Sequence, residues 1–240
     1  MKLFTRRGFT LIELLAVIAI IGILAAILFP AVSAVRKRAK IATSQTTFQQ
    51  WCTAVNRYKN TYGFYPNIGG GTNPKYDTSA DSLYQLEQGF PNASVGLKFV
   101  QALQGKKPSG ATMDQRTVLN RNAEAFCAFS KEDYISYSST VDNNGLLCDR
   151  FGNINIRVLF DTDGTGSIKQ VANLGLTASK LPDDLNSTKS DNSSGIDTSV
   201  GIPARVIIYT SKNDAMTNDG VSTSTTALSD SDSADIVAIQ

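Results

Sequence analysis

The chain has 240 residues, a formal net charge of +2, three cysteines and no histidine. This length accommodates one helical anchor and one modest globular domain. Without histidine the chain lacks the commonest general base and the commonest transition-metal ligand, and it contains no nucleophile motif such as GxSxG, so we expect that it is not an enzyme.

The small net charge conceals an asymmetry along the chain. Residues 1–60 carry nine basic side chains and one acid, Glu13, whereas the other 180 residues carry fourteen basic and twenty acidic side chains. A nucleic-acid-binding protein gathers its basic residues into a patch, with aromatic or arginine side chains for readout. A basic stem before a mildly acidic head does not match that pattern, so we expect no nucleic-acid partner.

An apolar run fills residues 9–29 and contains one charge, Glu13. Because a helix rises about 1.5 Å per residue, the run spans about 31 Å, close to the hydrocarbon core of a bilayer. It is too long for a cleavable signal peptide, so we expect a retained membrane anchor. Basic residues stand on both sides of the run, so charge counting does not decide its orientation. A carboxylate within a membrane span is costly unless paired, which marks Glu13 as functional, although a group near the interface can also reach water.

The segment Gly8-Phe9-Thr10-Leu11-Ile12-Glu13-Leu14 resembles the prepilin signal of type IV pilins and type II secretion pseudopilins. The resemblance implies that a prepilin peptidase cuts between Gly8 and Phe9 and that the new amine of Phe9 is methylated. It also implies that Glu13 faces the Phe9 amine of a neighbouring subunit in a fibre. The expected partners are copies of the chain, other pseudopilins, the peptidase and methylase, and an inner-membrane assembly platform. The expected location is the bacterial inner membrane, crossed once, with the head in the periplasm.

After Pro30 the pattern becomes amphipathic. Apolar residues recur at helical spacing from Val32 to Tyr62, and the stretch Tyr62-Gly63 predicts the end of the helix. We therefore expect four parts: a leader at 1–8, a transmembrane assembly helix at 9–30, an amphipathic stem helix at 31–62 and a periplasmic head at 63–240. The expected fold is α+β, with the long helix packed on a small antiparallel sheet that carries long loops.

The sequence of the head predicts its helices and strands less clearly. Segments 82–88 and 95–104 read as helical or mixed, and 124–129 reads as a short helix. Alternating apolar residues predict strands at 154–160 and 205–209. Polar stretches rich in Ser, Thr, Asn and Asp at 183–201 and 210–235 read as long loops. The paired acids Asp183 and Asp184 have no catalytic companions.

Two features of the head resemble the major pseudopilin of type II secretion. The first is Asp149-Arg150-Phe151-Gly152-Asn153, which is similar to a turn that precedes a strand in that family. The second is the acidic ending, and the resemblance implies a calcium site there, with candidate ligands Asp214, Asp230, Asp232 and Asp235. A solvated acidic tail remains the alternative. The resemblance predicts a pseudopilus subunit that drives protein export; the alternatives are a type IV pilin subunit of a surface fibre and a membrane-tethered binding protein.

Two further sites remain open at this point. The segment from Asp161 to Gly166 has the alternating acids and glycine of a calcium loop but lacks the acid at the twelfth position, so a hairpin turn between Phe160 and Ile168 is favoured. Cys127 and Cys148 would form a disulfide in an oxidising compartment if their geometry allowed it, and buried free thiols are an equal alternative. Cys52 is expected to be buried in the stem helix.

Overall fold

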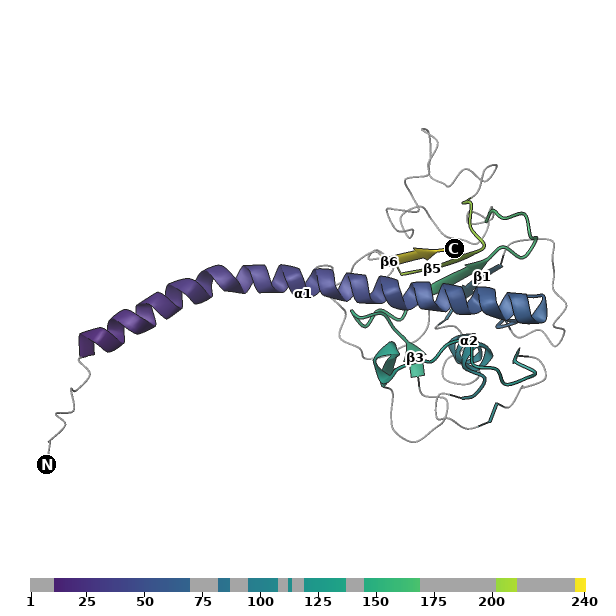
Figure 1. The fold of residues 1–240 in the computed structure, drawn as a ribbon, viewed down its shortest axis with the longest axis horizontal. Helices are drawn as coiled ribbons and strands as arrows, with labels where there is room; N and C mark the ends of the chain where they lie inside the picture. Colours follow the sequence, from purple (N-terminus) through teal and green to yellow (C-terminus); the bar gives the residue numbers. More distant parts are fainter. Residues whose placement is uncertain are drawn as a thin grey trace, which may run out of the picture. The chain divides into compact units, whose positions relative to one another are not determined.

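The computed structural model describes residues 11–69, 82–86, 95–107, 112–113, 119–136, 145–168, 202–210 and 236–240 (Figure 1). The chain divides into two compact units, residues 1–40 and residues 41–240. The second unit combines helices with small antiparallel sheets, so the expected α+β class is confirmed. The expected loop at 183–201 and all but the first residue of the expected loop at 210–235 lie outside the described residues, and that first residue, Thr210, ends a strand.

One helix, α1 (Leu11–Tyr62), belongs to both units, as the sequence predicts. It ends where glycine allows a left-handed residue: Gly63 has φ +81°, and its N–H donates to the carbonyl of Lys59 at 2.7 Å. The buried face of the helix begins later than expected, because Val32 and Val35 are 45% and 65% exposed. Within the second unit the helix buries a stripe at 3.6-residue spacing: Ser44, Phe48, Trp51, Cys52, Ala54, Val55 and Tyr58.

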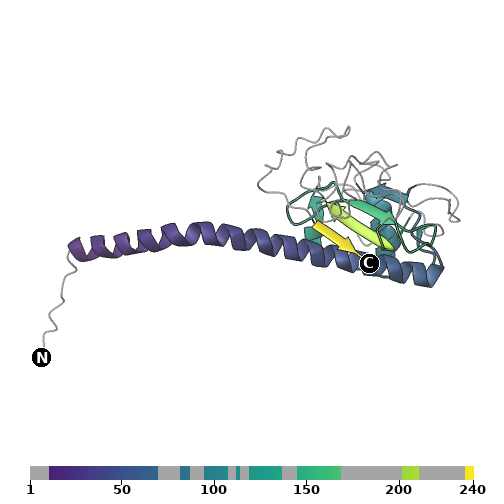
Figure 2. The same cartoon turned by 90° about the horizontal axis from the view of Figure 1, so that it is seen from above.

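A four-stranded antiparallel sheet lies against this buried stripe. Its strand order is β1-β4-β5-β6. The strands are β1 (Ser82–Gln85), β4 (Arg157–Phe160), β5 (Val206–Thr210) and β6 (Ile236–Ile239). Strand β6 lies alongside α1, as Figure 2 shows, and the Cys52 thiol donates to the carbonyl of Ala238 at 3.8 Å. A second, two-stranded sheet pairs β2 (Tyr134–Ser136) with β3 (Gly145–Leu147), and the short 3-10 helix η1 (Lys131–Asp133) precedes it.

The sheet buries both of its faces. Val206 and Ile208 of β5 join the main core with the stripe of α1 and with α2 (Val95–Gln104), whereas Ile207 and Tyr209 join a smaller second core. Successive residues of a strand point to opposite faces, so a strand buried along its whole length requires a core on each side.

Several local predictions for the head are wrong. Residues 82–85 form a strand rather than a helix, because they pair with β4 from Ser82–Phe160 to Gln85–Arg157. Residues 124–129 are not helical: the N–H groups of Phe126 and Cys127 both donate to the carbonyl of Leu103 at the end of α2. The strand predicted at 154–160 begins its ladder at Arg157. The helix at 95–104 and the strand near 205–209 are present as expected.

The hairpin turn expected between Phe160 and Ile168 is also wrong. Ile168 pairs with Ile202, through N–H to carbonyl bonds of 2.9 and 3.0 Å, rather than with β4. Since Phe160 pairs with Val206, both Phe160 and Ile168 face the chain segment that enters β5. Residues 161–167 therefore form a loop that leaves the antiparallel pairing after Phe160 and returns to it at Ile168.

Candidate assembly interface

The described N-terminal part of α1 presents apolar side chains to the outside. Exposure reaches 79% at Leu11 and 74% at Ile12, and it stays at or above 45% for eight further large residues: Leu14, Leu15, Val17, Ile18, Ile20, Ile21, Ile23 and Leu24. These positions occupy every side of a helix rather than one stripe. A helix that is apolar all round is stable only when something else covers it, a membrane or neighbouring helices. This surface is therefore an interface by its physical chemistry.

Glu13 lies in the first turn of the described helix, on this exposed surface. A carboxylate is favoured there by the partial positive charge of the helix N-terminus. Gly8 and Phe9, the other two predicted site residues, lie outside the described residues, so their relation to Glu13 stays a prediction.

A group of basic side chains follows the apolar surface on the same helix. Arg36, Lys37, Arg38 and Lys40 are all exposed. Within the part of the chain that the structure describes, no helix combines the length and apolar character that a membrane crossing requires.

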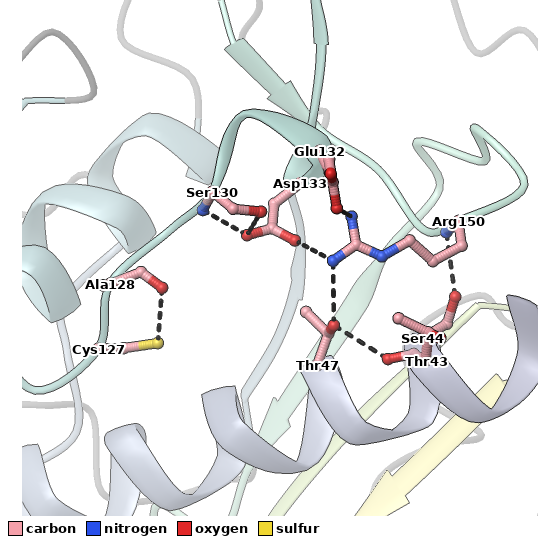
Figure 3. A network of polar contacts seen from close by, with 9 residues as sticks. All are labelled: Thr43, Ser44, Thr47, Cys127, Ala128, Ser130, Glu132, Asp133 and Arg150. Carbon is pink, nitrogen blue, oxygen red and sulfur yellow. Dashed lines mark hydrogen bonds and ion pairs between the residues drawn. The ribbon is translucent and has the colours of Figure 1, made fainter.

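A polar network that we call the Arg150 clamp joins the head to the next part of α1 (Figure 3). Its members are Ser44 and Thr47 of α1, Asp133 of η1 and Arg150. The Arg150 guanidinium donates to Asp133 Oδ1 at 2.9 Å and to Thr47 Oγ1 at 3.5 Å, while the Arg150 backbone N–H donates to Ser44 Oγ at 3.0 Å. The bond to the Asp133 carboxylate is charge-assisted and short, which makes it the strongest of the three. The clamp therefore fixes three separate segments to one another.

The segment that carries Arg150 is the turn predicted at 149–153. Asp149 Oδ1 accepts the N–H groups of Phe151 and Asn153 at 2.8 and 2.9 Å, and its Oδ2 accepts the hydroxyl of Thr210 at 3.2 Å. Burial raises the pKa of Asp149, and these hydrogen bonds to the charged form oppose that rise. The turn is a rigid support for the clamp.

The three cysteines are free thiols in the structure, so no disulfide joins Cys127 to Cys148 there. Cys52 is fully buried, as predicted. Burial raises the pKa of Cys127 to about 11 and that of Cys148 to about 12. Since the thiolate is the reactive form, these cysteines are poor nucleophiles near neutral pH.

The acids predicted to bind calcium, Asp214, Asp230, Asp232 and Asp235, lie outside the described residues, as do Asp183 and Asp184. Among the residues that are described, no group of three or more acidic, cysteine or histidine side chains is arranged to hold a metal ion. The loop that contains Asp161 and Asp163 brings two carboxylates together.

Comparison with known proteins bears on the N-terminal segment first. Residues 3–29 match the family model described as the prokaryotic N-terminal methylation motif. A type IV major pilin protein, PilE, of Neisseria gonorrhoeae is 33% identical over 109 residues, which are 43% of this chain and 65% of the relative. The motif and this relative support membership of the type IV pilin and pseudopilin superfamily.

Other relatives agree with this membership. A fimbrial protein of Neisseria meningitidis serogroup A is 33% identical over 109 residues, covering 43% of this chain and 64% of that protein. A second gonococcal pilin, PilE1, is 39% identical over 74 residues, covering 30% of this chain and 35% of the relative. The chain thus matches less than two thirds of the length of these relatives, and no solved structure matches it.

Together the motif and the relatives support a membrane-anchored fibre subunit. Because the relatives are pilins, they favour the predicted alternative, a pilin, over the predicted pseudopilin.

Sequence reasoning missed the Arg150 clamp. Its one signal is Ser130 followed three residues later by Asp133, the spacing of a capping box: the Asp133 carboxylate accepts both the N–H and the hydroxyl of Ser130. The partner Arg150 lies 17 residues further along the chain, beyond the reach of any local pattern.

Proposed function

We propose that this protein is the structural subunit of a type IV pilus-like surface fibre, and that it polymerises through α1 rather than acting as an enzyme. One observation carries the proposal: the helix that begins within the matched methylation motif exposes apolar residues on every side. Copies of such a helix bury this surface against one another in a bundle, while the Arg150 clamp holds each head on the stem of its own helix.

Maturation and register form the second part of the proposal. A prepilin peptidase removes residues 1–8, and methylation of Phe9 leaves a cationic amine. Inside an apolar bundle an ionised Glu13 is tolerable only when paired, so a subunit that enters out of register leaves a bare charge. Pairing of Glu13 with the Phe9 amine of a neighbour therefore selects the register more than it adds net stability.

Before assembly the subunit would reside in the bacterial inner membrane, crossing it once through residues 9–30, with the head in the periplasm. Its partners would be other copies of the chain, the peptidase and methylase, and an inner-membrane assembly platform. Calcium binding by Asp214, Asp230, Asp232 and Asp235 stays a prediction of the sequence.

A pseudopilus subunit of type II secretion, assembled with other pseudopilins, is the second candidate. The observation that favours it is the turn at 149–153, because its sequence resembles that of the major pseudopilin and the structure builds it as a hydrogen-bonded turn before β4. Both candidates assemble by the same mechanism. They differ in whether the fibre extends from the cell surface.

Deletion of the gene separates these candidates. We expect surface fibres, seen by electron microscopy and labelled by antibody to the head, to disappear and to return with the wild-type gene. Culture supernatants analysed in parallel should keep their exported proteins. Loss of export without any change in surface fibres would contradict the pilin proposal and support the pseudopilin. Intact-mass measurement of the membrane-extracted protein tests maturation, and a chain that retains Met1 to Gly8 in cells with active peptidase would contradict both candidates.

A further inference from the structure

The loop between β4 and Ile168 is anchored at both ends. At its start the N–H of Asp161 donates to the carbonyl of Arg205 at 2.9 Å, and at its end Ile168 pairs with Ile202. Between them, Gly164 and Gly166 adopt φ of +72° and +78°. Left-handed residues let the chain turn back sharply between the two anchored ends.

Asp161 is the unusual member of this loop. It is 1% exposed, its Oδ2 accepts the N–H of Gly166 at 2.9 Å, and its buried Oδ1 has no hydrogen-bond donor. A buried carboxylate oxygen without a partner costs free energy, which a bound water, a proton or a cation relieves.

Asp163 brings a second carboxylate to the same place. It is exposed, and its Oδ1 accepts the N–H of Thr165 at 2.9 Å. Asp161 and Asp163 interact through their charges, and the charge of Lys59 also acts on Asp161. The ammonium of Lys59 donates to Tyr65 Oη at 3.0 Å. Two adjacent ionised carboxylates repel each other, and either a shared proton or a bound cation relieves the repulsion.

We propose that this loop binds a calcium ion through the carboxylates of Asp161 and Asp163, with the Thr165 hydroxyl and loop carbonyls completing the shell. Calcium accepts six to eight oxygen ligands in a flexible geometry, and carbonyl and hydroxyl oxygens serve as well as carboxylates. Magnesium requires a tight octahedron, which a loop with these mixed ligands does not supply. The structure removes the reason to prefer a hairpin turn, because Ile168 does not pair with β4. The proposal does not depend on the kind of fibre.

Two carboxylates are fewer than a tight calcium site has. We therefore expect a dissociation constant of about 0.1–1 mM, the range of extracellular modules. The variant Asp163→Asn suits the test because an asparagine oxygen also accepts the Thr165 N–H, so the turn is kept while the charge is lost. Glu124→Gln is the matched control, since Glu124 is an exposed carboxylate elsewhere in the head.

The experiment is isothermal titration of the purified full-length chain in detergent with calcium chloride and, separately, magnesium chloride. The wild type and Glu124→Gln should bind calcium alike, Asp163→Asn should bind at least tenfold more weakly, and magnesium should bind more weakly than calcium. Circular dichroism of each variant confirms that the fold is retained. The double variant Asp230→Asn/Asp232→Asn tests the acidic segment near the C-terminus, and it should keep the binding. Absence of calcium binding in the wild type, equal binding of magnesium, or unchanged binding in Asp163→Asn would overturn the proposal.

Discussion

The Arg150 clamp makes a quantitative prediction about how the head is held on α1. In Arg150→Met the side chain of Asp133, 6% exposed, loses an ion pair of 2.9 Å, and Thr47 loses a donor at 3.5 Å. The bond from the backbone N–H of residue 150 to Ser44 is unaffected by the substitution. The loss is therefore confined to the guanidinium.

The expected loss of unfolding free energy depends on the hydrogen bonds that Asp133 retains. Removing one partner of a buried ion pair costs about 3–5 kcal/mol. Asp133 still accepts two hydrogen bonds from Ser130, and the Arg150 side chain is 18% exposed. We therefore expect the free energy of unfolding to fall by about 2–3 kcal/mol, and a cycle with Asp133→Asn to give a coupling of about 1–2 kcal/mol.

Trp51 provides the assay because it is the only tryptophan in the chain. It is 1% exposed, and its ring lies 5.4 Å from that of Phe129, next to Ser130. Urea unfolding of the full-length protein in detergent, followed by Trp51 emission, measures the change. The control is Glu132→Gln: Glu132 lies 3.6 Å from Arg150 but is 82% exposed, so its loss should change the stability by less than about 0.5 kcal/mol. If Arg150→Met were no more destabilising than Glu132→Gln, the clamp would have no structural role.

Three other predictions concern Glu13, Gly105 and Asp149. Glu13→Gln should leave the head folded and prevent incorporation into fibres, because an uncharged residue cannot select the register; fibres at the wild-type level in a sheared fraction would contradict this. Gly105→Ala should destabilise the protein by about 2–5 kcal/mol, since Gly105 has φ +73° and a Cβ there would lie 2.5 Å from the carbonyl oxygen of Ala123. The matched Gly63→Ala, with φ +81° and open space, should cost about 1–2 kcal/mol in the same urea experiment, and equal costs would refute the steric argument. Burial raises the pKa of Asp149, so the folded state takes up this proton more readily than the unfolded state, and the contribution of Asp149 to stability falls as pH rises above the ordinary carboxyl value. Asp149→Asn should therefore gain stability relative to the wild type as the pH rises above about 4, and a stability difference that does not change with pH would contradict this effect of burial.

Elements set by local periodicity were predictable from the sequence. Helix α1 follows from one long apolar pattern with a glycine after its end, and α2 follows from a short one. Residues 82–85 contain no such signal, because their strand conformation depends on pairing with β4 more than 70 residues away. Residues 124–129 satisfied a helical pattern, but Asn120 Oδ1 accepts the N–H of Glu124, and Leu103 takes the N–H groups of Phe126 and Cys127. These competing acceptors prevent a helix.

Some features of the candidate interface could likewise be predicted from the sequence, and others could not. The apolar surface of α1 and the position of Glu13 in its first turn could be predicted, because both depend on residues adjacent in the sequence. The Arg150 clamp could not, since Ser44, Asp133 and Arg150 meet only when the head packs on the helix. The start of the buried stripe near Ser44 also depends on where the head packs, whereas the apolar pattern begins at Val32.

The bridge between Ile168 and Ile202 has a consequence for protein engineering. Both residues are buried, at 0% and 4% exposure, and their two hydrogen bonds hold the ends of the segment 169–201 side by side. An insert whose ends lie at that spacing would be compatible with both hydrogen bonds of the bridge. Closing a four-residue turn there instead of 33 residues lowers the entropy cost of loop closure by about 2 kcal/mol. A foreign peptide grafted between these two isoleucines would be displayed once on every subunit, and a polymer of the chain would present it as a regular array.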